Sequence, residues 1–139
     1  MKNNKGFSLV ELIIVIAIMA ILVGVMAPQL IKYIEKTNVS SDIQLCDSVR
    51  TALTTAIMDP DNAKAGATLN DGSGAVSSIS DASIKSTAEE ILGVSLGNLA
   101  SQVKSKTGKS GTLTYKKNGN QLKVYFSNAE TTIYSGNSN

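Results

Sequence analysis

The chain has 139 residues, of which 42% are apolar and 17% are charged, and its formal net charge is +2. This composition excludes a disordered polyelectrolyte and a polytopic membrane protein, and the length accommodates one small domain with an appendage. The sequence has no His, no Trp and one Cys. These counts exclude a disulfide within the chain, a Cys/His zinc cluster and every histidine-activated nucleophile. We therefore expect no catalytic residue, no metal site and no cofactor.

The N-terminal segment combines a short basic leader with a long apolar run. Residues 1–6 contain two lysines and no acid, and from Phe7 to Ala27 only Ser8 and Glu11 are polar. A helix over this run is about 32 Å long, which matches the hydrocarbon core of a bilayer. By the positive-inside rule the leader stays in the cytoplasm. We expect the precursor to be a single-pass protein of the cell membrane.

Glu11 distinguishes the apolar run from a plain membrane anchor. A secretory signal peptide would have a shorter apolar core and an Ala-x-Ala-like site, and a buried core helix would need a larger protein around it. A carboxylate inside a membrane helix is costly without a partner, and this segment offers no basic side chain. We expect Glu11 to meet a group from another molecule. The alternative is that its side chain reaches back to the lipid headgroups.

The residues around the start of the apolar run form a recognisable motif, Gly6-Phe7-Ser8-Leu9-Val10-Glu11, preceded by the lysine-bearing leader. This pattern resembles the class III signal of type IV pilins and pseudopilins, over residues 1 to about 36. The resemblance implies that a prepilin peptidase cuts between Gly6 and Phe7 and methylates the new amino group of Phe7. It also implies that Glu11 pairs with the amino terminus of a neighbouring subunit during filament assembly.

Gly24 and Pro28 are expected to weaken the helix. Pro28 cannot donate to the carbonyl of Gly24 and its ring crowds that carbonyl, so the sequence predicts a kink there. Gly24 is itself a poor helix former. The resemblance implies that the segment before Pro28 can unwind when subunits pack. Many relatives have an earlier helix-breaking glycine where this chain has Ala20, which leaves the extent of unwinding open.

The rest of the pattern predicts an α+β fold, a long helical spine with a small C-terminal head. Apolar residues such as Val49 and Leu53 continue the helical spacing, with Asp42 and Asp47 assigned to the polar face. Asp59-Pro60 ends this helix. The expected organisation is a leader over 1–6, a transmembrane and filament-core helix over 7–28, an amphipathic half over 29–58, and a head over 59–139 comprising a loop (59–81), short helices (82–104) and a β-meander (111–134).

The end of the chain predicts a three-stranded antiparallel meander packed on the amphipathic half of the helix. Asn118-Gly119 is a strong signal for a two-residue hairpin turn. A second tight turn is expected at Asn128-Ala129. With these turns, the expected facing pairs are Tyr115–Leu122, Leu113–Val124, Val124–Ile133 and Phe126–Thr131.

Charge is divided unevenly along the chain, with net values of +1, −4 and +5 for residues 1–58, 59–98 and 99–139. Lys116, Lys117 and Lys123 form a candidate basic patch along the predicted hairpin. Three interpretations stay open. The basic sheet attracts the acidic region of a neighbouring subunit, it binds DNA or another acidic polymer, or it is an ordinary solvated surface.

Three functions fit these features. The first is the structural subunit of a type IV pilus, serving adhesion, surface motility or DNA uptake. The second is a pseudopilin of a type II secretion or competence system, and the third is a membrane-anchored binding module that does not polymerise. The absence of the paired cysteines found in many Gram-negative pilins favours a Gram-positive major pilin. An enzyme is least favoured, because no carboxylate pair or nucleophile has a recognisable partner.

The pilin interpretation also predicts partners and location. The expected partners are identical subunits in a helical filament, a prepilin peptidase, an inner-membrane assembly platform and the membrane before assembly. DNA or a host surface is a further candidate partner. The expected location is the cell membrane for the precursor and the extracellular surface for the filament.

Overall fold

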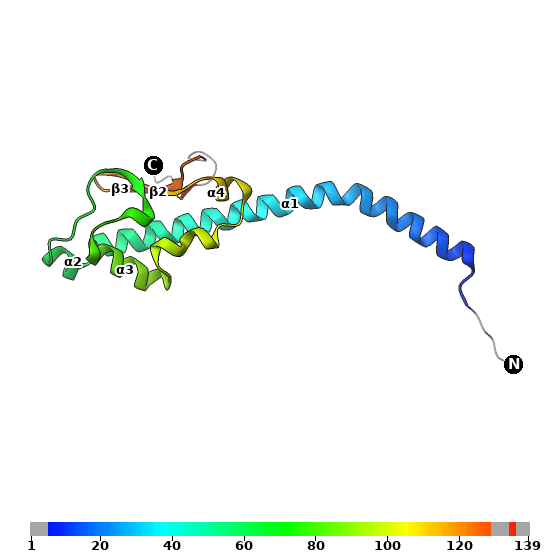
Figure 1. Ribbon diagram of the computed structural model, residues 1–139, viewed down its shortest axis with the longest axis horizontal. Coiled ribbons are helices and arrows are strands. Elements are labelled where there is room, and N and C mark those ends of the chain that lie inside the picture. The colour runs from blue at the N-terminus through cyan, green and yellow to red at the C-terminus, as the bar shows by residue number, and fades with distance from the viewer. Residues whose placement is uncertain (1–5, 129–133, 136–139) are drawn as a thin grey trace. The chain divides into compact units, whose positions relative to one another are not determined.

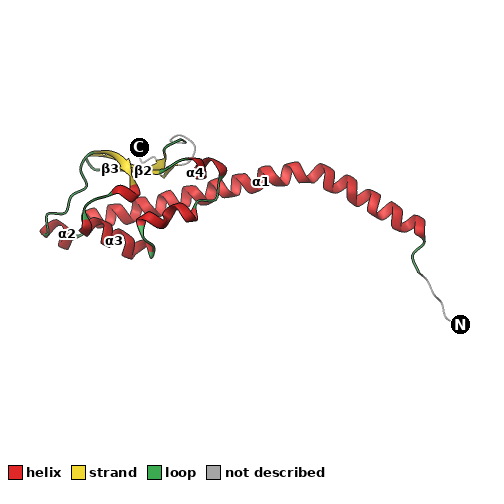
Figure 2. Ribbon diagram, viewed as in Figure 1, coloured by secondary structure: helices red, strands yellow, loops and turns green. Residues whose placement is uncertain are grey.

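The computed structural model describes residues 6–128 and 134–135 of the chain, with helices and strands as labelled in Figure 1 and coloured by type in Figure 2. The chain divides into two compact units, Met1–Glu35 and Lys36–Asn139. The helix α1, Leu9–Met58, contributes residues to both units.

In the first unit the described structure is a helix with its apolar side chains exposed. Leu9, Ile21 and Ile31 are each more than half exposed, and none of the most apolar 18-residue window of α1 is buried within the chain. Within the described part of the chain, α1 is the one helix long and apolar enough to cross a membrane. It continues without a break through Pro28. The kink expected at Pro28 stays a prediction.

The second unit is the head together with the second half of α1. Short helices and strands follow Met58 in the chain. Asp59 and Asp81 cap the two α-helices that come next after α1, by accepting main-chain N–H groups. The elements are α2 (Pro60–Lys64), β1 (Gly72–Ala75), the 3-10 helix η1 (Val76–Ser78), α3 (Ala82–Leu92), the 3-10 helix η2 (Leu96–Gln102), α4 (Lys106–Ser110), β2 (Leu113–Asn118), β3 (Gln121–Phe126) and β4 (Tyr134–Ser135).

The sheet is antiparallel with the strand order β1-β2-β3-β4. The predicted α+β class and the meander β2-β3-β4 are confirmed, but the prediction of loop throughout 59–81 was wrong. That segment also contains α2, β1 and η1. Strand β1 has the sequence Gly-Ser-Gly-Ala, which lacks the apolar alternation of a half-buried strand, and it is held by pairing of its backbone with β2. The alternation rule therefore missed it.

The register of the hairpin differs by two residues from the prediction. Tyr115 faces Val124 and Leu113 faces Phe126, because the loop residues are Gly119 and Asn120. Gly119 has φ 58°, a left-handed value that a glycine adopts without strain. A shift of two residues keeps the same side chains on the same face. The predicted apolar face therefore survives the error in register.

The next pairing is shifted in the same way. Val124 faces Ser135 and not Ile133, so this register also differs by two residues from the prediction. The partner proposed for Phe126, Thr131, and the second turn residue, Ala129, lie outside the described residues. Phe126 faces Leu113 on its other side.

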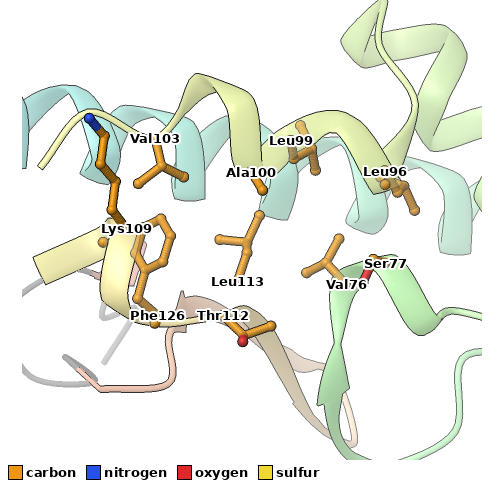
Figure 3. A pocket seen from close by; sticks show the side chains of 13 residues that line it. Val76, Ser77, Leu96, Leu99, Ala100, Val103, Lys109, Thr112, Leu113 and Phe126 are labelled. Atoms are coloured by element: carbon orange, nitrogen blue, oxygen red, sulfur yellow. The ribbon is translucent and has the colours of Figure 1, made fainter. Parts of the chain in front are cut away.

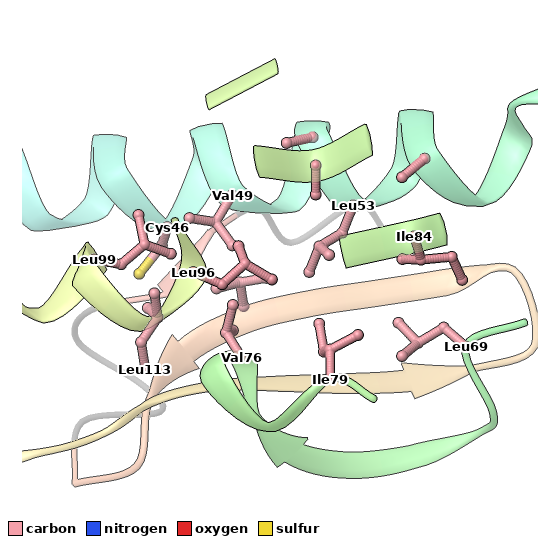
Figure 4. Packing of buried hydrophobic residues seen from close by; sticks show 14 of the residues in the cluster. Cys46, Val49, Leu53, Leu69, Val76, Ile79, Ile84, Leu96, Leu99 and Leu113 are labelled. Atoms are coloured by element: carbon pink, nitrogen blue, oxygen red, sulfur yellow. The ribbon is translucent and has the colours of Figure 1, made fainter. Parts of the chain in front are cut away.

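The core of the head lies between the second half of α1 and the sheet (Figure 4). Cys46, Val49 and Leu53 of α1 are fully buried there. They pack in one cluster with side chains from the sheet and from the short helices, as expected for the amphipathic face of α1. The buried members from beyond α1 are Leu69, Val76, Ile79, Ile84, Ala88, Leu96, Leu99, Val103, Leu113, Val124 and Phe126.

Candidate functional site

The first candidate site is the start of α1, where Ser8 and Glu11 bond each other reciprocally. The main-chain N–H of Ser8 donates to Oε2 of Glu11 at 3.1 Å, and the N–H of Glu11 donates to Oγ of Ser8 at 3.2 Å. This arrangement is a capping box, which satisfies N–H groups that the first turn of a helix leaves without partners. The Ser-x-x-Glu spacing is visible in the sequence and is typical of this cap. The sequence interpretation of Glu11 gave a group from another molecule or the lipid headgroups as its partner, and not this internal cap.

The residues before the cap are non-helical and exposed. Gly6 and Phe7 precede α1 in backbone without regular structure, and the Phe7 side chain is 87% exposed. Glu11 is exposed as well. The structure thus brings the expected cleavage bond, the expected methylation site and the carboxylate within six residues of one another. Exposed segments outside regular structure are the preferred sites of proteolysis, and this segment has both properties.

Gly24 and Pro28 lie on the exposed helix of the first unit. A Cβ atom added to Gly24 would meet no atom within 4 Å apart from its own helical backbone and its chain neighbours. Nothing within the described residues therefore requires a glycine at this position. Its low helix propensity remains the physical reason to expect local unwinding near Pro28.

The three lysines of the candidate basic patch do not share one face. Strand alternation places Lys117 on the core side with Tyr115, and places Lys116 and Lys123 on the outer side. The Nζ of Lys117 lies 2.7 Å from Oδ1 of Asp71, and the Lys117 side chain is only 17% exposed. Asp71 also accepts the N–H of Gly119, and these donors hold the pKa of its carboxyl below the ordinary value. The ion pair of Lys117 with Asp71 therefore links the hairpin turn to the start of β1.

On the outer side of the sheet, Lys116 and Lys123 face each other directly across β2 and β3. Ser73 of β1 faces Lys116 from the other side. Neither ammonium group has a carboxylate within 4 Å among the residues that the structure describes. Like charges directly opposite each other destabilise a sheet. We call these three facing residues, Ser73, Lys116 and Lys123, the outer lysine row.

The second site that sequence reasoning missed is a buried carboxylate on α1. Asp42 is fully buried, although we assigned it to the polar face. It accepts the N–H groups of Lys104 at 2.9 Å and Ser105 at 3.0 Å, and also the hydroxyl of Ser105. The signal was present in the helical spacing, since Asp42 precedes the buried Cys46 by four residues and Val49 by seven. We interpret this cluster as a structural clasp between α1 and the loop before α4.

A pocket of about 210 Å³ lies between η2 and the start of β2 (Figure 3). Its lining is mostly apolar and includes Leu99, Val103, Leu113 and Phe126. Lys109 supplies the one ammonium group of the described lining, and no acidic side chain contributes. The pocket thus continues the core of the head, and it presents no pair of groups suited to acid-base or nucleophilic chemistry.

The match to a known protein family concerns the same N-terminal segment. Residues 1–27 match the family model described as the prokaryotic N-terminal methylation motif. Over 59 residues the chain is 39% identical to a fimbrial protein of Pseudomonas aeruginosa, a match that covers 42% of this chain and 38% of the relative. Over 56 residues it is 41% identical to the type IV major fimbrial protein FimA of Dichelobacter nodosus, covering 40% of this chain and 36% of the relative. The chain thus has the N-terminal methylation motif and is similar over part of its length to type IV fimbrial proteins.

The likeness of this chain to these relatives covers about two fifths of its length. A fimbrial protein of Moraxella nonliquefaciens is 42% identical over 55 residues, which cover 40% of this chain and 36% of the relative. The chain therefore spans less than two fifths of the length of the curated relatives it matches. No solved structure matches the chain. The names of these relatives describe fimbrial proteins and no enzyme.

Proposed function

We propose that this chain is the subunit of a type IV pilus, which polymerises through its N-terminal helix after the leader is removed. One observation carries the proposal. The exposed apolar half of α1 begins three residues after Gly6, and Glu11 lies in its first turn. Such a long exposed apolar surface must be covered by lipid or by other copies of the helix. A filament would replace the lipid contacts of the precursor by contacts between helices.

Cleavage is the first step of the proposed assembly. A cut between Gly6 and Phe7 removes the basic leader and leaves a free, positively charged amino group at Phe7, which methylation would leave charged. The exposed, non-helical backbone at these two residues supports access by a prepilin peptidase. The precursor would then be held in the membrane by α1 alone, with an inner-membrane platform extracting it into the fibre.

The second step is the pairing of Glu11 with the amino group of a neighbouring copy. The internal cap occupies Oε2 of Glu11 with a single N–H donor. An ionised carboxylate has about four acceptor positions on its two oxygens, so it can hold the cap and accept an ammonium group together. Between apolar helices such a pair satisfies both charges and fixes the axial register of the copies.

The roles of the completed fibre are part of the same proposal. Adhesion, surface motility and DNA uptake all use an extracellular filament, and the head would form its outer surface. A pseudopilin would assemble by the same two steps into a shorter fibre within a secretion or competence system. A monomeric anchored module would keep α1 in the membrane and would not need Glu11.

The proposal is tested by a variant at the cleavage site together with imaging. Gly6→Phe should block removal of the leader, so the variant chain should be heavier than wild type by the mass of six residues. Sheared surface material from wild-type cells should show fibres by electron microscopy that contain the shorter chain. Processing of Gly6→Phe at the normal rate would contradict the peptidase assignment. Processed chain that never leaves the membrane would contradict the pilus.

A further inference from the structure

Asn118-Gly119, at the turn between β2 and β3, is a dipeptide that can lose its side-chain amide without an enzyme. The pair occurs once in the chain, and both residues are exposed. Because glycine has no Cβ, its main-chain nitrogen can approach Cγ of the preceding asparagine closely. No hydrogen bond holds the side-chain amide of Asn118 among the residues that the structure describes. The electrophilic half of the reaction is therefore free.

The reaction of such a pair is deamidation through a cyclic imide. The main-chain nitrogen of Gly119 bonds to Cγ of Asn118, and the bond between Cγ and Nδ2 breaks. Nδ2 leaves as ammonia together with the hydrogen that the Gly119 nitrogen gives up. Water then opens the ring at one of its two carbonyl carbons and leaves an aspartate or an isoaspartate at this position. Water is the one co-reactant that the step consumes.

The nucleophilic half, the Gly119 nitrogen, is held by a residue that is distant in sequence. Its N–H donates to Oδ1 of Asp71 at 3.1 Å, and the same oxygen lies 2.7 Å from Nζ of Lys117. The Lys117 side chain is only 17% exposed, so the oxygen is fixed by a largely buried partner. Gly72, the next residue after Asp71, faces Lys117 in the pairing of β1 with β2. Both the ion pair and the sheet therefore keep Asp71 beside the turn.

The Asp71 carboxylate hinders this attack and does not assist it. The Gly119 nitrogen must leave Oδ1 and turn toward Cγ of Asn118, so the reaction waits for a local opening of the turn. The nitrogen must also lose its proton, and a negative charge in direct contact opposes the amide anion that forms. Lys117 and the N–H of Gly119 hold the pKa of the Asp71 carboxyl below its ordinary value. So weak a base cannot remove an amide proton.

We propose that Asn118 is a site of spontaneous deamidation, and that the contact of Asp71 with the Gly119 N–H keeps its rate low. Strand alternation places Asn118 on the same face as Lys116, two residues earlier. The new carboxylate would therefore add a negative charge beside the outer lysine row. An isoaspartate would also lengthen the main chain by one methylene group and disturb the pairing of β2 with β3. This site lies in the head and does not depend on whether the chain forms a filament.

The test follows the full chain in detergent micelles at mildly alkaline pH by mass spectrometry. Trypsin cuts after Lys117 and Lys123, so residues 118–123 are released as one peptide. The deamidated peptide is heavier by about 1 Da, and its fragment ions separate Asn118 from Asn120. Wild type incubated folded and wild type incubated in denaturant give the hindered and the unhindered rates.

Two variants separate the role of Asp71 from that of an acid in general. Asp71→Ala removes the acceptor of the Gly119 N–H. Asp61→Ala is the matched control, because it removes an exposed acid of the head whose Oδ1 lies 3.9 Å from Nζ of Lys64. Labelling of the buried Cys46 thiol shows whether each variant stays folded.

We expect Asn118 of folded wild type to deamidate about tenfold more slowly than in denaturant. Asp71→Ala should lose most of this protection while it stays folded, and Asp61→Ala should keep it. Should Asp71→Ala unfold the head, Lys117→Gln decides in its place, because it frees Asp71 from the ion pair and should also raise the rate. Equal rates for folded and denatured wild type would overturn the proposal. A folded variant at Asp71 or Lys117 that reacts no faster than wild type would overturn it as well.

Discussion

Asp42 and Ser105 are 63 residues apart in the chain, and the buried carboxylate of Asp42 accepts both the N–H and the hydroxyl of Ser105. A third donor, the N–H of Lys104, completes the clasp. The hydroxyl oxygen of Ser105, the N-cap of α4, in turn accepts the N–H of Gly108 in the first turn of that helix. One acid on α1 thereby fixes the loop that leads into α4 and then into β2.

Asp42→Ala should destabilise the head by about 3 kcal/mol, because it leaves two main-chain N–H groups and one hydroxyl buried without an acceptor. Asp47→Ala is the matched control, an exposed acid on the same helix whose carboxylate lies 3.9 Å from Nε of Arg50. Chemical denaturation in detergent, followed by labelling of the buried Cys46 thiol, measures the difference. Equal stabilities of the two variants would show that the clasp does not hold the head.

Gly108→Ala should be destabilising for a steric reason at the same clasp. A Cβ at position 108 would lie 2.5 Å from Oδ2 of Asp42 and 2.7 Å from Cγ1 of Val103, both of them buried side chains. Gly97→Ala is the control, because a Cβ there meets no atom within 4 Å. We expect a lower midpoint of thermal unfolding for Gly108→Ala alone. A midpoint equal to that of the control would contradict the close packing of this loop.

Cys46 should be inert in the folded head. Burial raises the pKa of its thiol from 9.0 to about 12, with the nearby acids Asp42 and Asp47 adding to the shift. The reactive thiolate is therefore scarce at neutral pH. Labelling with iodoacetamide at pH 8 should be negligible until denaturant unfolds the head. Rapid labelling of the folded chain would contradict this environment.

Asp81 should make the head sensitive to acid. The N–H groups of Ile84 and Thr68 hold the pKa of the Asp81 carboxyl below the ordinary value of 3.8. A depressed pKa stabilises the folded state above pH 3.8, and this contribution is lost as pH falls through the folded-state value. Asp81→Ala should therefore lower the unfolding midpoint at pH 7, and the difference from wild type should shrink below about pH 3.8. A difference that is constant with pH would contradict this linkage.

The elements that the sequence predicted well are those with local signals. The apolar run, the helix end before Pro60 and the hairpin near Gly119 each depend on neighbouring residues. The predicted hairpin register was wrong by two residues. The sequence does not show whether the turn is Asn118-Gly119 or Gly119-Asn120, and the backbone has the turn at Gly119-Asn120, with a positive φ at Gly119. Strand β1 and the clasp of Asp42 depend on partners 39 or more residues away in sequence. Local patterns cannot identify such partners.

Glu11 carries the central claim, and its two roles can be separated. Glu11→Val removes the carboxylate and should prevent polymerisation while the precursor stays in the membrane. Ser8→Ala removes the hydroxyl half of the cap, at a cost of about 1 kcal/mol to the helix start, but keeps the carboxylate. We expect fibres from Ser8→Ala and from the exposed control Glu90→Gln, and none from Glu11→Val. Normal fibres from Glu11→Val would contradict the pairing role.

The distance between Glu11 and the Phe7 amino group of an adjacent copy, measured in an electron cryomicroscopy map of the processed fibre, tests the claim most directly. The account predicts a separation of no more than about 4 Å, the range of an ion pair. A fibre in which each Glu11 contacts only Ser8 of its own helix, with the neighbouring amino group elsewhere, would contradict it.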